Sequence, residues 1–138
     1  MSCRNLPLGL LLALALGSAG CGKFRQISAC RGVAREVNRA MDELDALAKA
    51  RPLDEPRLAK RYATLAKALE PRAQGKTPLA QAVREYVLVL RATDTSLRNH
   101  ASALKLPAGR VGEPRRELER LVKREHAAVA RIDVECER

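Results

Sequence analysis

The chain has 138 residues, 46% of them hydrophobic but only 2% aromatic, and 26 basic against 16 acidic residues give a net charge of +10. This length suits one domain, and this composition is typical of helices that pack through aliphatic side chains. The scarcity of aromatic rings weighs against nucleic-acid binding by base stacking. The positive charge favours anionic partners and does not determine the fold.

The first 20 residues have the layout of a secretory signal. Arg4 precedes the apolar run Leu6–Leu16. This run is too short to cross a membrane, because a spanning helix needs about 20 apolar residues. Small residues follow it and glycines interrupt it, so a core helix is a poor alternative. We therefore predict that residues 1–20 are removed and that the protein is exported.

The end of this signal contains Ser18-Ala19-Gly20-Cys21, which resembles the lipobox of bacterial lipoproteins but departs from it at Ser18, where leucine is usual. The resemblance implies that Cys21 carries fatty acids such as palmitate and becomes the first residue. An ordinary signal peptidase acting after Gly17-Ser18-Ala19 is the alternative. Gly22 is not the aspartate that retains lipoproteins in the inner membrane of enteric bacteria. This favours an outer-membrane anchor with the domain in the periplasm.

The cysteine count supports lipidation. Of the four cysteines, Cys3 leaves with the signal, and Cys21, Cys30 and Cys136 remain. Three cysteines in an oxidising compartment would leave one unpaired, whereas a lipid on Cys21 leaves Cys30 and Cys136 as a pair.

Four amphipathic helices are expected in residues 28–138, after a short tether at residues 21–27. Apolar residues recur at three- and four-residue steps from Cys30 to Ala48, and Pro52 ends this first helix near Ala50. Asp54-Glu55-Pro56 and Thr77-Pro78 are helix starts, each with a capping side chain and a proline in the first turn. The remaining boundaries follow from prolines and glycines: Pro71, Gly75, Pro107, Gly109, Gly112 and Pro114.

Short loops between four amphipathic helices predict an all-α, up-down-up-down four-helix bundle. The run 86–90 is apolar on all sides, and we expect it to be the most buried helical stretch. The topology places the start of the first helix and the end of the fourth together. Cys30 and Cys136 then both point inward at that end, as a disulfide requires. Two buried free thiols are the alternative.

The motifs of known catalytic sites are missing from the sequence. No serine after the signal lies in a Gly-x-Ser-x-Gly turn, and there is no glycine-rich phosphate loop. Neither His100 nor His126 has a glutamate three residues earlier, as metal sites in helical bundles do. We therefore expect no catalysis, no metal and no cofactor.

One polar residue interrupts an apolar stripe: Glu125 falls between Val122 and Val129. A buried carboxylate must be paired or neutralised. One interpretation is an edge position that reaches water or an arginine. The other is an interior site where Glu125 contacts an arginine, Tyr62, Tyr86 or a ligand.

Basic residues gather at the end of the predicted bundle next to Cys21, namely Lys23, Arg25, Arg31, Arg72 and Lys76. Near anionic lipid headgroups, each well-placed charge adds about 1 kcal/mol to membrane binding. The alternative is an ordinary solvated surface, because acidic residues interleave with the basic ones along the helices.

Together these features predict a non-catalytic envelope lipoprotein, held to the membrane by its N-terminal lipid, with a structural or partner-binding role. Its partner would be an envelope protein or an anionic polymer, and not a nucleic acid. The alternative is a bundle that senses a ligand or a stress by binding a small or anionic molecule. A cavity near Glu125 that is lined by alanines would favour this alternative over a tight core.

Overall fold

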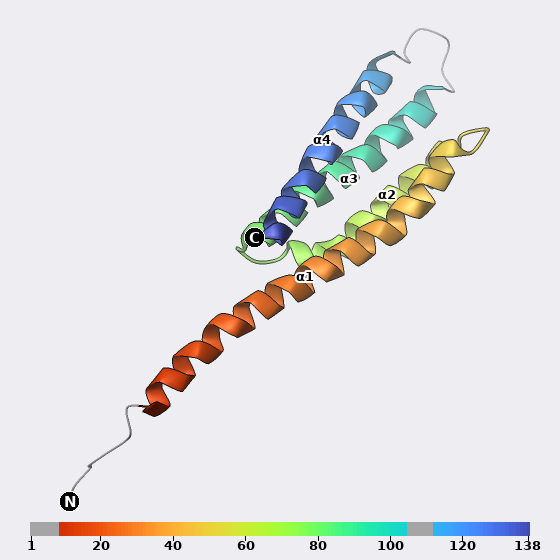
Figure 1. The fold of residues 1–138 in the computed structure, drawn as a ribbon. Coiled ribbons are helices and arrows are strands. Elements are labelled where there is room, and N and C mark those ends of the chain that lie inside the picture. Colours follow the sequence, from red (N-terminus) through yellow and green to blue (C-terminus); the bar gives the residue numbers. More distant parts are fainter. Residues whose placement is uncertain (1–8, 105–111) are drawn as a thin grey trace, which may run out of the picture.

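The protein is all-helical over the part of the chain that its computed structural model describes. This part comprises the backbone of residues 9–104 and 112–138 and the side chains of residues 22–104 and 115–138. The elements in chain order are α1 (Gly9–Lys49), α2 (Glu55–Leu69), the 3-10 helix η1 (Glu70–Ala73), α3 (Pro78–Ala103) and α4 (Gly112–Glu137). Figure 1 shows the helices side by side in a bundle, with the first turns of α1 reaching away from it. The prediction of an all-α class is confirmed.

Local signals set the helix starts, as the sequence predicted. The Asp54 side chain accepts a hydrogen bond from the backbone N–H of Arg57 at 2.9 Å, and Thr77 accepts one from Ala80 at 3.1 Å. Each cap satisfies an N–H group that has no partner inside its helix. Gly75 adopts a φ of 99° after η1, a conformation that glycine tolerates without strain. The expected loop at Pro107 and Gly109 lies outside the described residues.

Helix α1 is longer than expected. Residues 21–27, which we predicted to form a tether, belong to this continuous helix. No proline occurs between Pro7 and Pro52, so every residue between them keeps a backbone N–H for the helix, and the glycines that we expected to interrupt the apolar run do not end it. The Gln26 side chain also donates a hydrogen bond to the backbone carbonyl of Glu135 in α4, at 2.9 Å. The predicted signal cleavage and the Cys21 side chain lie outside what the structure describes.

The core consists of aliphatic side chains from all four helices around one tyrosine. Tyr86 and Leu90 are fully buried, and Val87 and Val89 are nearly so. Leu88 is 56% exposed, so the expectation that the whole 86–90 run is buried is wrong at this position. The reason is geometric, because α3 packs against α2 and α4 and keeps a third face toward solvent.

The helices do not pack evenly. Helix α3 packs closely against both α2 and α4, and α1 packs mainly against α2. By contrast, α1 and α4 contact each other at few positions. The bundle is therefore open along the seam between α1 and α4, and this opening forms the candidate site.

Candidate functional site

A groove of about 840 Å³ lies between α1 and α4, and we name it the α1–α4 groove. Small-molecule sites in proteins usually have volumes of 300–1,000 Å³. Exposed side chains of α1 and α4 form its two walls, and the more buried side chains of Tyr62 on α2, Tyr86 on α3 and Glu125 on α4 form its floor. The lining residues are Val37, Asn38, Met41, Leu44, Asp45, Ala48, Tyr62, Tyr86, Val122, Glu125, His126, Val129, Ala130 and Asp133.

Glu125 lies at the floor of this groove with the two tyrosines, so the structure brings together all three residues of the suspected polar site. Glu125 is only 8% exposed, and the Tyr86 hydroxyl donates to its Oε1 at 3.5 Å. Tyr86 is fully buried, whereas Tyr62 is half-buried. Of the two interpretations of Glu125, the geometry favours the interior contact with tyrosine.

The electrostatics of the three residues follow from burial. Burial raises the pKa of the Glu125 carboxyl, although nearby His126 and hydrogen bonds from Tyr86 and Tyr62 act in the opposite direction. Burial, together with the charge and hydrogen bond of Glu125, raises the pKa of Tyr62 to about 12. The pKa of Tyr86 is raised by the same causes and by Tyr62. Both hydroxyls therefore stay protonated and able to donate at neutral pH.

The groove continues toward the bundle end that carries the cysteines. A second cavity of about 450 Å³ is lined by Cys30 and Cys136, and it shares Val37, Asn38, Val129 and Asp133 with the first. An elongated ligand could therefore extend from Glu125 toward the disulfide.

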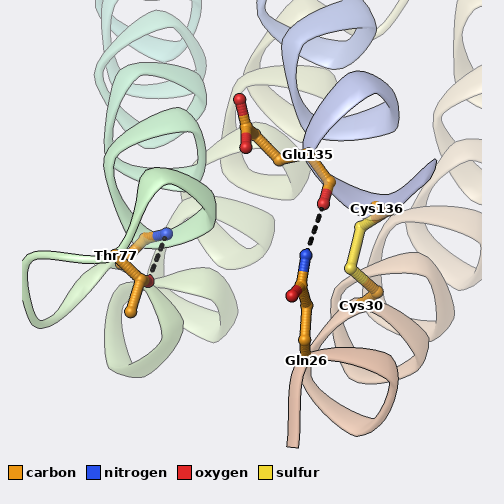
Figure 2. Close-up of a disulfide and its surroundings, with 6 residues drawn as sticks. Gln26, Cys30, Thr77, Glu135 and Cys136 are labelled. Atoms are coloured by element: carbon orange, nitrogen blue, oxygen red, sulfur yellow. Dashed lines mark hydrogen bonds between the residues drawn. A yellow bond between two sulfur atoms is a disulfide. The ribbon is translucent and has the colours of Figure 1, made fainter. Parts of the chain in front are cut away.

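The predicted pair, Cys30 and Cys136, lies at this end with its sulfurs 2.09 Å apart and its Cα atoms 5.7 Å apart. Figure 2 shows the bridge beside the hydrogen bond from Gln26 to Glu135, so two links hold α1 to α4 here. The expected inward orientation holds for Cys30, which is half-buried and packs against the core, and is wrong for Cys136, which is exposed. With α1 and α4 apart elsewhere, the bridge lies at the rim of the bundle.

The five basic residues of the suspected membrane-proximal patch are all exposed: Lys23, Arg25, Arg31, Arg72 and Lys76. Arg72 places its guanidinium against the α-carbon of Gly32, which ties η1 to α1. None of the five side chains has an ion-pair partner among the described residues, whereas Arg61, Arg91 and Arg131 pair with glutamates on neighbouring elements.

Sequence reasoning missed one polar pair. Nδ1 of His100, near the end of α3, lies 2.7 Å from Oε1 of Glu55, at the start of α2, and both side chains are largely buried. The second carboxylate oxygen of Glu55 has no hydrogen-bond partner in the described structure. The pair could have been predicted from the order of the helices, because antiparallel packing of α2 and α3 brings the start of α2 beside the end of α3.

Comparison of the chain with protein-family models, with curated proteins and with solved structures found no match. Over the described residues, no helix combines the length and the apolar character needed to cross a membrane. In the same part of the chain, no three histidine, cysteine or acidic side chains lie together as metal ligands would.

Proposed function

We propose that the protein is a non-catalytic, lipid-anchored accessory protein of the bacterial envelope whose helical bundle binds a molecule in the α1–α4 groove. The observation that carries the binding role is the groove itself, with the buried carboxylate of Glu125 at its floor. A purely structural bundle needs no such opening, and a buried carboxylate beside a cavity is costly unless a partner compensates for it.

An up-down-up-down connectivity is part of this proposal. Its support is the order of contacts, since each helix packs against the next one along the chain. Such a bundle places the N-terminal part of α1, which includes Cys21, beyond the end where the bridge between Cys30 and Cys136 lies.

The lipid anchor is supported by the Ser18-Ala19-Gly20-Cys21 motif and by the pairing of Cys30 with Cys136, which leaves Cys21 as the single unpaired cysteine after signal removal. The basic patch supports an orientation with this end toward anionic headgroups, because its five side chains are exposed and unpaired within the described residues. The residue after Cys21 favours the outer membrane.

Replacement of Cys21 tests the anchor. Cells that express Cys21→Ser and are fed an alkyne analogue of palmitate are expected to lose all label from the protein, because the thiol that accepts the lipid is gone. Ser18→Leu, which restores the usual lipobox residue, is the matched control and should keep the label. Equal labelling of the wild type and Cys21→Ser would contradict the proposal.

The binding role is tested by filling the groove. Ala130 lines it, whereas Ala127, which is one turn earlier on α4 and is also exposed, lies outside it. The protein is isolated from its own cells as wild type, Ala130→Phe and Ala127→Phe, and native mass spectrometry records any bound molecule. We expect wild type and Ala127→Phe to carry the same added mass and Ala130→Phe to lose it, because the phenyl ring occupies the groove. If no form carries added mass, or all three carry it equally, the groove is not the binding site.

A further inference from the structure

The charge of the α1–α4 groove is opposite to that of the protein as a whole. The chain carries 26 lysines and arginines, yet none lines this groove among the residues with described side chains. Three carboxylates do, from Asp45, Glu125 and Asp133. Asp45 is paired with Lys49 at 2.5 Å, which leaves Glu125 and Asp133 without a lysine or arginine partner in the described structure.

Resting on the proposed function, we propose that the ligand of this groove is a small organic cation, an ammonium group attached to an apolar body. This proposal differs from the expectation of a small or anionic molecule, because acidic side chains line the groove and would repel an anion.

Glu125 and the two tyrosines provide the head-group site. The hydrogen bond from Tyr86 is long, at 3.5 Å, and the carboxylate has further acceptor positions for a donor that enters from the groove. An ammonium group donates several hydrogen bonds and forms strong charge-assisted bonds with a carboxylate. Aromatic faces also attract ammonium groups, and Tyr62 and Tyr86 both line the floor.

The walls fit an apolar body. Met41 on α1 and Val122 on α4 line opposite walls and are 43% and 48% exposed, and Val37 and Val129 extend the apolar surface toward the disulfide. A ligand lying along these side chains removes apolar surface from water, which favours binding. The polar floor and apolar walls together select a molecule with one charged end.

The raised pKa of Glu125 in the ligand-free protein is consistent with an ammonium ligand at this site. Its pKa is raised by burial, and a bound ammonium would lower it by supplying the missing counter-charge. His126, Asp45 and Asp133 also face the groove, and His126 already acts in the same direction as a ligand cation. Ammonium binding should therefore tighten as the pH rises and Glu125 loses its proton.

A matched series of probes tests the head group. The probes are 4-phenylbutylammonium, 4-phenylbutanol and 4-phenylbutyrate, which share one body. Titration calorimetry uses the full chain in nanodiscs of zwitterionic lipid, with empty nanodiscs as the blank. We expect the ammonium to bind about tenfold more tightly than the alcohol or the carboxylate, as for a hydrogen bond to a charged group. Glu125→Gln should reduce ammonium binding to the level of the alcohol, and Glu125→Asp should keep the preference.

Glu85→Gln is the control, because it removes an equal charge from the exposed face of α3, where Glu85 pairs with Arg131. It should leave all three affinities unchanged. Thermal unfolding of each variant verifies the fold. The inference is overturned if the ammonium and the alcohol have equal affinities that Glu125→Gln does not change. If Ala130→Phe abolishes the binding of both probes in that case, the binding role of the groove still stands. Tightest binding of the carboxylate overturns it too. If none of the probes binds, the inference also fails, and the binding role then depends on the native mass measurement alone.

Discussion

Reduction of the bridge between Cys30 and Cys136 is expected to lower the free energy of unfolding by about 4–5 kcal/mol. The bridge joins residues 106 positions apart, and in the chain-entropy model a crosslink of this span removes that much freedom from the unfolded chain. Small domains are stable by only about 5–15 kcal/mol, so the loss should lower the melting temperature by roughly 15 °C. Thermal unfolding with and without reductant, and of the double variant Cys30→Ser/Cys136→Ser, measures it.

Reduction of the bridge should loosen the packing between α1 and α4 more than the packing between the other helices. Because α1 and α4 contact each other at few positions, the bridge and the Gln26–Glu135 hydrogen bond are their main links at this end. Hydrogen exchange in the reduced protein should therefore accelerate in α1 around Cys30 and less in α3. Cys21→Ser is the control and should leave the melting temperature unchanged. An unchanged melting temperature in the double variant would show that the bridge does not stabilise the fold.

Glu125→Gln is expected to stabilise the ligand-free protein against unfolding at pH 8 and to have no effect near pH 3. Burial raises the pKa of Glu125 in the folded state above its value in the unfolded chain. The folded protein therefore has its full free energy of unfolding at a pH below the pKa that Glu125 has in the unfolded chain. It loses part of this free energy as the pH rises through the pKa that Glu125 has in the folded state. Glutamine keeps an acceptor for the Tyr86 hydroxyl without the charge, so it avoids this loss.

Urea unfolding at several pH values between 3 and 8 measures this difference. Glu85→Gln is again the control, since an exposed ion pair contributes little, and its effect should stay within about 0.5 kcal/mol at every pH. A lower stability of Glu125→Gln at pH 8 would mean that the tyrosines and His126 more than compensate for the burial of the carboxylate. The calorimetry adds a second measurement on the same variant. If Glu125→Gln is more stable than the wild type but no longer binds the ammonium more tightly than the alcohol, Glu125 serves binding at a cost in stability.

Part of the candidate site could be predicted from the sequence. Helical spacing identified Glu125 as a polar residue in an apolar stripe. Contact with an arginine, Tyr62 or Tyr86 was one of its two interpretations, and the structure places Glu125 with the two tyrosines. Helical spacing does not give the distance between two helices, so neither the opening between α1 and α4 nor the acidic contribution of Asp45 and Asp133 was expected. The pair formed by Glu55 and His100 was missed because no local pattern marks residues 45 positions apart, although the antiparallel order of α2 and α3 brings the start of one beside the end of the other.

The sequence by itself determined the end of α1, the starts of α2 and α3, and the cysteine pair. Caps and prolines act within a few residues, so Asp54, Thr77 and Pro52 set boundaries without reference to the rest of the chain. Cysteine parity and loop lengths are likewise independent of packing. Only the tertiary structure decided that α1 stays apart from α4, that the bridge lies at the rim, and that a basic protein carries an acidic groove. These features depend on how side chains from separate helices fill the space between them, and local sequence does not encode that.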